Sequence, residues 1–441
     1  MYPGWRYKCR MQKSHTQSDV PAVRVKRPER HQVQWRDASL DQMIPKDHRV
    51  RAIWAYVDSL DLKPLYRKIQ AVEGGAGRDA VDPKILLALW MLATVEGVSS
   101  ARHLDRLCER DLPYLWICGE VGVNYHLLAT FRTEHGEFLE GLLTDTIATL
   151  LHQQIVTLET VAQDGMRVRA SAGSSSFRRE KSLLQCRQEA AEQVKRLGQE
   201  SRDEQDFDAS HARRRAAAER AAADREQRIE QALQELAKLQ QQKEERKSGS
   251  GQEARSSTTD PEARRMKMGD GGFRPAYNVQ FATDGATRMI VSVDVSNNGS
   301  DGGQMAPMHE DVCQRYGKVP DHYTVDGGFA TKEDITQVEQ RGSQVAAPMT
   351  HADRIEQRGG DPHARRATDN DAMAAFRERM RTDEAKAVLK KRPSIAEFPN
   401  AECRNRGLQQ FRVRGLKKVR TVTLWYAITF NFMRMMNLGL I

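Results

Sequence analysis

Two aspartates in this 441-residue chain follow apolar, strand-like stretches, where a carboxylate could take part in chemistry. Asp164 comes after "TVAQ", and Asp326 comes after "HYTV" and precedes two glycines. Such glycines let the backbone turn sharply and let a bulky phosphate chain come close. Glu397, in the cation-rich segment "KKRPSIAEFPNAECRNRG", is the best candidate for a third carboxylate.

Three converging carboxylates would suit magnesium. Mg²⁺ takes oxygen ligands and is often held by one or two carboxylates together with substrate phosphates, so three acids could hold two ions. Two ions about 3.5–4 Å apart can activate a water or a 3′-hydroxyl and stabilise the leaving oxygen of an in-line phosphoryl displacement. The chain has 60 Asp and Glu residues, so a single acid carries little information and the hypothesis depends on the combination.

Basic residues crowd the same C-terminal segment as Glu397. Phosphate contacts from such residues position DNA without reading its sequence. Arg392 and Arg404, five residues before and seven after Glu397, are predicted to lie against DNA phosphate near the metal ions. The other cations predicted to bind DNA are Arg406, Arg414, Lys417 and Lys418. A solvated helix face is the alternative interpretation of this cluster.

The overall composition fits a polyanionic partner. The chain has 69 Lys and Arg against 60 Asp and Glu, a net charge of +9 and a pI near 9.2. This excess suits nucleic acid, although it also suits a soluble basic protein. Six scattered cysteines without a CxxC pair indicate thiols of a reducing compartment, not a zinc site or disulfide framework. The longest apolar run, "ILLALWMLATV", is about half a membrane span, so a cytoplasmic protein without membrane contact is predicted.

The elements that must position the acids indicate an α/β fold. The segments "RPAYNVQFATD" and "MIVSVDVS", joined by the turn "DGATR", predict a hairpin. Once the charged insertion after "TVAQDGMRV" is set aside, the order is strand, strand, strand, helix, strand, helix, strand, helix. That order predicts a mixed sheet flanked by helices, with Asp164 at or near the end of its first strand. The closing segment "TVTLWYAITFNFMRMM" is predicted to be a core helix.

Helical segments precede and interrupt this sheet. Residues 37–150 have helical periodicity, with Asp82 as an N-cap and Pro83 at the first helical position. Helices on either side of the turn region "GEVGVN" could form a helix-turn-helix, although a plain bundle is the simpler alternative. Residues 177–254 carry apolar stripes at heptad-like spacing and predict an antiparallel helical hairpin or short coiled coil. Residues 1–36 are predicted to be a flexible basic arm.

The chain resembles the DDE-type insertion-sequence transposases of bacteria from "SLDQMIPKDHRVRAIWAYVDSLDL" to its C-terminus. The stretches that carry the resemblance are "VNYHLLATFR", "VAQDGMRVRASAG", "STTDPEARRMKMGDGGFRPAYNVQFATD", "SDGGQMAPM", "VDGGFAT" and "AECRNRGLQQFRVRGLKKVRTVTLWYAITFNFMR". The resemblance implies an RNase H-like catalytic domain, placed at residues 151–176 and 255–441. Residues 37–150 would be a helical DNA-binding domain, and residues 177–254 a charged helical insertion. The family's three catalytic, metal-binding acids fall on Asp164, Asp326 and Glu397.

The reaction that the resemblance implies is Mg²⁺-dependent, with two ions for which Mn²⁺ can substitute. A phosphodiester at the element's end would be hydrolysed, and the freed 3′-hydroxyl would attack target DNA. Double-stranded DNA, as terminal repeats and as target, is the implied partner at the bacterial nucleoid. Because two ends must be brought together, a homodimer or larger assembly on DNA is implied. The apolar stripes of the insertion motivate the hypothesis that it supplies a dimer contact or a DNA clamp.

The sequence departs from the family pattern around the third acid. Leu389 stands where family members often have a tyrosine, three residues before Arg392. Pro399 follows Glu397 by two residues, and a proline inside a helix costs about 3 kcal/mol or more. Glu397 should therefore lie in a first helical turn or beside a bend, and Glu402 is a rival third ligand. The alternatives to a transposase are a catalytically decayed DNA-binding copy and an RNase H-like nuclease without strand transfer.

Overall fold

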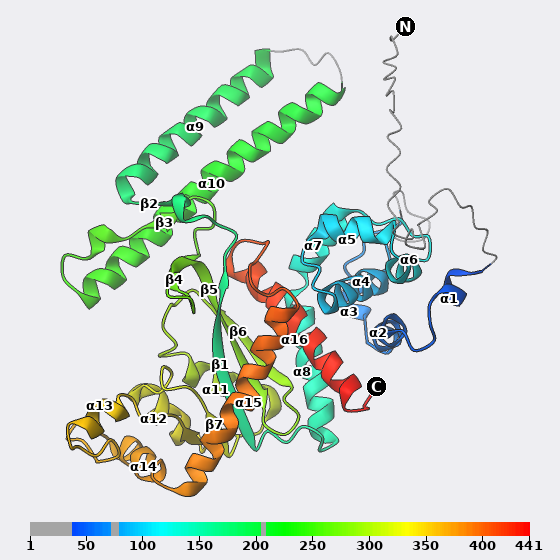
Figure 1. Ribbon diagram of the computed structural model, residues 1–441. Helices are drawn as coiled ribbons and strands as arrows, with labels where there is room; N and C mark the ends of the chain where they lie inside the picture. The colour runs from blue at the N-terminus through cyan, green and yellow to red at the C-terminus, as the bar shows by residue number, and fades with distance from the viewer. Residues whose placement is uncertain (1–37, 72–78, 204–208) are drawn as a thin grey trace, which may run out of the picture.

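The computed structural model describes residues 38–71, 79–203 and 209–441. The basic arm predicted for residues 1–36 lies outside these described residues. Figure 1 shows three groups of elements: N-terminal helices, a sheet with its covering helices, and a long helical hairpin that projects from the sheet. No helix in the described ranges has the length and apolar character needed to cross a lipid bilayer.

The N-terminal region is helical, as predicted. Its helices are α1 (Leu40–Met43), α2 (Arg49–Asp58), α3 (Lys63–Tyr66), α4 (Pro83–Val95), α5 (Ala101–Cys108), α6 (Leu112–Cys118), α7 (Tyr125–Glu134) and α8 (Gly136–His152). The Asp82 side chain accepts a hydrogen bond from the Lys84 backbone N–H, and Pro83 occupies the first turn, which confirms the predicted start of α4. This helix is buried almost throughout and forms the centre of the region.

The predicted helix pair around "GEVGVN" is more divided than the sequence indicated. The short α6 precedes that turn, and the segment after it breaks at His135 into α7 and α8. Arg132 on α7 is buried, where its guanidinium lies over Trp90 and donates to the Ser99 carbonyl. Its charge therefore serves the packing of this region and is not available to a DNA groove.

The central sheet confirms the predicted mixed arrangement. Its strands are β1 (Thr160–Arg169), β4 (Arg264–Lys267), β5 (Phe273–Asp284), β6 (Ile290–Ser296), β7 (His322–Thr324) and β8 (Gln344–Ala346). β5 pairs antiparallel with β1 on one edge and with β4 and β6 on the other, and β7 and β8 run parallel to β1. The predicted hairpin is β5–β6, whereas β4 was not predicted.

Helices cover both faces of the sheet. They are α11 (Met305–Tyr316), α12 (Lys332–Gln340), α13 (Ala352–Gln357), α14 (Asp371–Arg379), α15 (Asp383–Asn405) and α16 (Leu416–Asn437). α15 packs on β1, β5 and β7, where Ala162, Ile395 and Ala396 form a small apolar cluster. α11 contacts the opposite face, since His309 packs edge-on against Tyr323. The predicted core helix is α16, which is buried against β6, α8 and α4.

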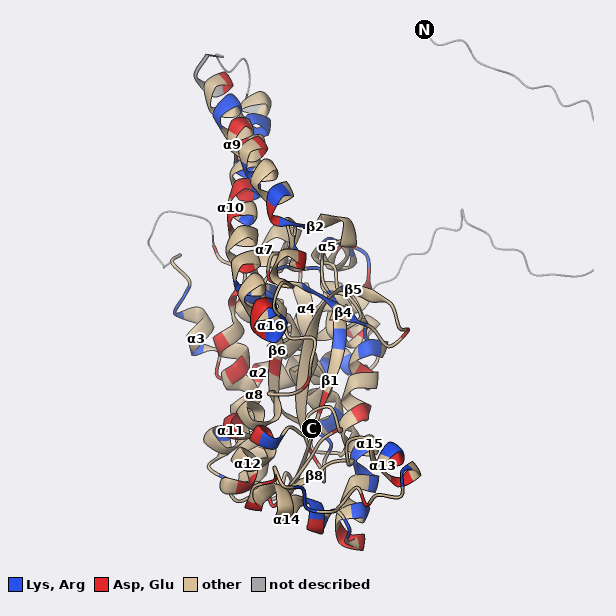
Figure 2. Ribbon diagram, turned by 90° about the vertical axis from the view of Figure 1, so that its left-hand side faces the viewer, with Lys and Arg blue, Asp and Glu red and all other residues tan. Residues whose placement is uncertain are grey.

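The insertion is an antiparallel helical hairpin, as predicted. α9 (Glu180–Asp203) pairs with α10 (Ala209–Arg246), and the short segments η1 (Ser174–Ser176), β2 (Phe177–Arg178), η2 (Gly251–Glu253) and β3 (Ser256–Ser257) join it to the sheet. Its apolar residues are buried between the two helices, including Leu183, Ile229 and Leu236. The stripes that motivated a dimer contact are therefore used within the hairpin itself. Figure 2 shows that both charge signs alternate over its surface.

Candidate active site

The register of two parallel strands aligns the first two acids. Thr160 lies opposite His322 and Ala162 opposite Thr324, so partners differ by 162 in number. Asp164 and Asp326 differ by the same 162 and each lies two residues beyond the last of these pairs. Neighbouring strands are about 4.8 Å apart, so continuing this register places the two carboxylates side by side. Asp164 is in the middle of β1, which continues five residues to Arg169, so its predicted place at or near the strand end is corrected.

Helix α15 carries the third acid to the same place. The Arg392 guanidinium lies 3.9 Å from a carboxylate oxygen of Asp326 and 3.8 Å from one of Glu397. Its side chain is only 11% exposed, whereas the Asp326 and Glu397 side chains are 59% and 61% exposed. Arg392 therefore lies between these two acids, and its predicted contact with DNA phosphate stays a prediction. Its Nη1 atom is buried without a hydrogen-bond partner in the described structure.

Asp164 is the most enclosed of the three acids. Its Oδ2 atom accepts a hydrogen bond of 2.9 Å from the Asn400 amide, one helical turn beyond Glu397 on α15. Burial raises the pKa of the Asp164 carboxyl to about 6, although Arg392 and the hydrogen bonds from Gly165 and Asn400 oppose this rise. Asp326 contributes a further increase, as expected for a neighbouring carboxylate. A cation at this place would favour the ionised form.

The residues present fit a hard divalent cation by their chemistry. The three acids offer carboxylate oxygens, and the Asn400 Oδ1 atom is buried without a hydrogen-bond partner among the described residues. No group of three or more His, Cys, Asp or Glu side chains within the described ranges is already drawn together tightly enough to ligate a metal. The acids converge on Arg392, which supplies positive charge between them.

Sequence reasoning missed an acid on the opposite face of β1 from Asp164. Asp301, in the stretch "SDGGQM", accepts hydrogen bonds from Arg167, Asn278 and Gln280 at 2.9, 2.7 and 3.3 Å. It lies against Gly165, because a Cβ atom added there would lie 2.9 Å from Asp301 Oδ1 and 2.5 Å from Gln280 Nε2. The glycine after Asp164 therefore makes room for a polar cluster, a role that the sequence did not signal.

The glycines after Asp326 behave differently from the prediction of a sharp glycine-dependent turn. Neither Gly327 nor Gly328 has a positive φ. A side chain at Gly328 would approach Asp301 only to 3.8 Å, an ordinary contact. A Cβ atom at Gly327 would lie 3.4 Å from the Pro348 carbonyl oxygen, so Gly327 is the more constrained of the two.

Of the two predicted places for Glu397, a first helical turn or a bend, the structure excludes the first. Pro393 and Pro399 both lie inside the 23-residue α15, and Glu397 is in its interior, not in a first turn. Pro399 is buried in the packing between α15 and the rest of the protein. The rival acid Glu402 forms a 2.8 Å ion pair with Arg406. Arg392 contacts Glu397 and Asp326, and no ion pair in the described residues links it to Glu402.

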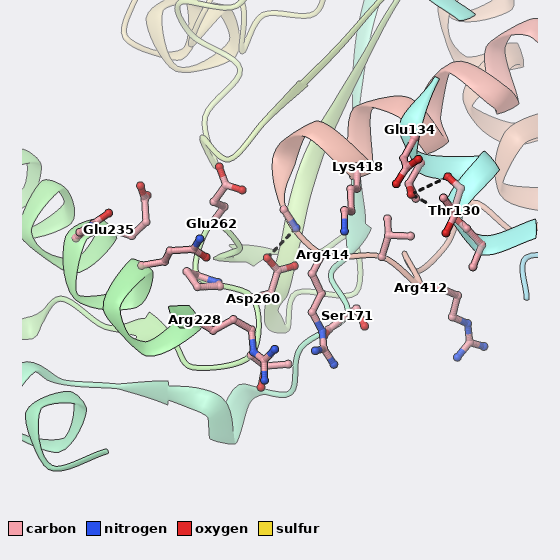
Figure 3. Close-up of a pocket in the computed structure, with 18 residues that line it drawn as sticks. Thr130, Glu134, Ser171, Arg228, Glu235, Asp260, Glu262, Arg412, Arg414 and Lys418 are labelled. Atoms are coloured by element: carbon pink, nitrogen blue, oxygen red, sulfur yellow. Dashed lines mark hydrogen bonds between the residues drawn. The ribbon is translucent and has the colours of Figure 1, made fainter. Parts of the chain in front are cut away.

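The cations predicted to bind DNA fall into two places. Arg404 is exposed and lines a cavity of 770 Å³ next to Gly165, whereas Arg406 is held by Glu402. Arg414 and Lys418 line a different cavity of 810 Å³, bounded by α7, α10 and the loop before α16 (Figure 3). Lys417, also exposed, is their neighbour in sequence. The second cavity has mixed charge, with four cations against four acids, namely Arg228, Arg412, Arg414, Lys418, Glu134, Glu235, Asp260 and Glu262.

Two family models match the chain. One is described as a transposase domain (DUF772) and matches residues 38–134, and the other is described as a transposase DDE domain and matches residues 246–432. Together they cover more than half of the chain, and Asp326 and Glu397 lie inside the second match while Asp164 precedes it. No curated protein and no solved structure matches the chain.

A transposase DDE domain has the RNase H-like fold, which agrees with the mixed sheet β6-β5-β1-β7-β8 and its flanking helices. Transposases act on DNA, and DDE enzymes generally use divalent metal ions. A helical transposase domain at the N-terminus and a DDE domain after it are found together in the transposases of insertion sequences. This chain belongs to the DDE transposases of insertion sequences.

Proposed function

We propose that this transposase hydrolyses a phosphodiester at the ends of its element and then joins the freed 3′-hydroxyl to target DNA, with Asp164, Asp326 and Glu397 as its catalytic acids. The observation that supports the proposal is the shared 162-residue offset, which puts Asp164 beside Asp326 in the β1–β7 register. Arg392 brings Glu397 to the same pair of acids.

The three carboxylates are proposed to hold two Mg²⁺ ions, for which Mn²⁺ can substitute. Bound there, the ions would supply the charge that activates a water or hydroxyl and stabilises the leaving oxygen. Asp164 would be the shared, fixed ligand, because Asn400 orients one of its oxygens and β1 holds its backbone. The open exposure of Asp326 and Glu397 leaves room for the phosphate that reacts.

The protein's own contribution is positioning. Asp164 comes from the middle of β1, which pairs with β5 along nine residues, and Glu397 comes from the interior of a long helix, so neither depends on a loop. Rigid elements of this kind hold reacting groups in place without reorganisation during the reaction. Two DNA ends must be held at once, so we propose a homodimer or larger assembly on DNA.

Labelled DNA carrying the sequences that flank the gene tests the proposal. The wild-type protein should nick and join this DNA in Mg²⁺ or Mn²⁺, and Asp164→Asn, Asp326→Asn and Glu397→Gln should each abolish both reactions while leaving DNA binding intact. Glu402→Gln is the matched control, because Glu402 lies on the same helix but pairs with Arg406.

The same assay separates the alternatives. Cutting without joining would identify a nuclease of the same fold, and binding without cutting would identify a decayed copy. Loss of activity in Glu402→Gln with retention in Glu397→Gln would show that the third ligand is misplaced. The assembly proposal is tested separately by light scattering with and without paired DNA ends, and a persistent monomer on DNA would contradict it.

A further inference from the structure

A basic cavity adjoins β1, the strand that carries Asp164. Gly165, the residue after Asp164, forms part of its wall. Five cations and one acid also line it, namely Arg167, Arg169, Lys267, Arg274, Arg404 and Asp270. This imbalance distinguishes it from the cavity of Figure 3, where cations and acids are equal in number. Figure 2 shows blue segments of Lys and Arg beside β4 and β5, the strands that flank this cavity.

Three of these cations form no ion pair with any described residue. Arg167 is paired with Asp301 at 2.9 Å, and Arg274 with Asp270 at 2.6 Å. Arg169, Lys267 and Arg404 are exposed and form no ion pair with any described residue. They come from β1, β4 and α15, so the fold gathers three separate elements into one positively charged wall.

The cavity shares two elements, β1 and α15, with the acid site. Arg169 lies five residues beyond Asp164 on β1, about 16 Å at the rise of a strand. Arg404 lies seven residues beyond Glu397 on α15, about 10 Å along the helix and on nearly the same side, because seven residues are close to two turns. A backbone bridge between Arg169 and Gln410 joins the far ends of β1 and the segment after α15. Two of the acids and two of the unpaired cations thus lie on the same two elements, β1 and α15, with the side chains of Asp164 and Arg169 on opposite faces of β1.

We propose, resting on the proposed transposase function, that this cavity binds the phosphodiester backbone of the DNA strand that carries the scissile phosphate. Arg169, Lys267 and Arg404 contact consecutive phosphates on one side of the cleavage position. Arg167 is a positioning residue that is itself fixed by Asp301. Contacts of this type carry no sequence information and set the register of the strand over the acids.

Binding of a fluorescein-labelled duplex carrying the DNA that flanks the gene, in EDTA, measures these contacts without any metal or cleavage. We expect at least about tenfold weaker binding from the triple variant Arg169→Gln, Lys267→Gln, Arg404→Gln. The slope of log K against log salt should also become shallower by about 2–3, because each lost phosphate contact reduces its magnitude by about 0.7–0.9. The charge-matched control is Arg354→Gln, Arg358→Gln, Arg366→Gln, three exposed arginines on or after α13 that do not line the cavity.

Uncharged methylphosphonate linkages then locate the contacts. Placed singly on one side of the scissile phosphate in the cleaved strand, they should weaken the wild-type complex and leave the triple variant unaffected. Interference only from the complementary strand, or a salt slope of the triple variant equal to that of the control triple, overturns the proposal. If the triple variant fails to fold by circular dichroism, the single exposed change Arg404→Gln replaces it, with an expected slope reduction of about 1.

Failure of this proposal is distinguishable from failure of the catalytic one. Asp164→Asn removes no cation, so its salt slope should not fall below that of the wild type, whereas its cleavage should be lost. A protein that binds DNA through this cavity and never cuts contradicts the catalytic proposal alone. A protein that cuts and joins with an unchanged salt slope in the triple variant contradicts the cavity proposal alone.

Discussion

Asp164→Asn is expected to stabilise the metal-free protein at alkaline pH while it abolishes catalysis. The ordinary pKa of this carboxyl is 3.8, and burial raises the pKa in the folded protein to about 6. Since one pKa unit corresponds to 1.36 kcal/mol, ionising Asp164 in the folded state costs about 3 kcal/mol relative to the unfolded chain. Asparagine keeps the shape and an oxygen for the Asn400 amide but carries no charge.

The sign follows from the raised pKa. The folded protein holds the proton more tightly, so the contribution of Asp164 to stability is present in full below pH 3.8 and is lost as the pH rises through about 6. The free energy of unfolding of Asp164→Asn should therefore exceed that of the wild type by up to about 3 kcal/mol at pH 8, and by about half as much at pH 5. For a chain of this length, about 3 kcal/mol corresponds to a melting-temperature rise of about 3 °C.

Thermal unfolding in EDTA, followed by circular dichroism at both pH values, measures this difference. Asp326→Asn is the matched control, because its side chain is 59% exposed and its replacement should change stability little. Adding Mg²⁺ should stabilise the wild type and not Asp164→Asn. A variant that is less stable than the wild type by the same amount at both pH values would refute the burial argument.

Arg392→Gln should destabilise the metal-free protein by about 1–3 kcal/mol at pH 8, because it leaves the carboxylates without the positive charge between them. Thermal unfolding in EDTA should show this loss, and the same measurement with Mg²⁺ should show that the ion reverses it. Glu402→Gln should change the free energy of unfolding by no more than about 1 kcal/mol, because it breaks only a partly exposed ion pair. A larger decrease in the free energy of unfolding, measured by urea titration, would contradict this. Gly165→Ala should lower stability by about 1–3 kcal/mol and slow cleavage, because its methyl group would lie 2.5 Å from the Gln280 amide. If Gly165→Ala had the melting temperature and nicking rate of the wild type, the polar side chains around Gly165 would have to move without loss of stability, which would contradict this prediction.

Much of the fold could be predicted from local pattern. The alternating apolar residues of β5 and β6 and the turn between them predicted the hairpin, and the Asp82-Pro83 signal predicted the start of α4. Both signals are local, because alternation and capping depend on neighbouring residues only. β4 has only four residues, too few to show a clear alternation, and the break between α7 and α8 involves the single residue His135. Neither feature was therefore predicted.

The environment of the three candidate acids could not be predicted from local pattern. Asp164 and Asp326 are marked by the strands before them, but the polar partners of the site come from distant segments. Asp301 follows no strand-like pattern of its own, and only the folded sheet brings it against Gly165. The sequence predicts a contact of Arg392 with DNA phosphate but not its burial between carboxylates, because that burial depends on tertiary packing.

The insertion shows why the long separation of the first two acids does not disturb their geometry. The chain leaves β1, forms the α9–α10 hairpin and returns, and the pairing of Phe177 with Ser257 closes this excursion at its base. β1 therefore pairs with β5 as if the two strands were joined by a short turn, from Val161–Asp284 to Arg169–Ala276. Loop-closure cost grows only slowly with length, and a hairpin that buries its own apolar residues adds little disorder. An insertion of another length would change the difference of 162 in residue number. The pairing of β1 with β7 would still bring Asp326 next to Asp164.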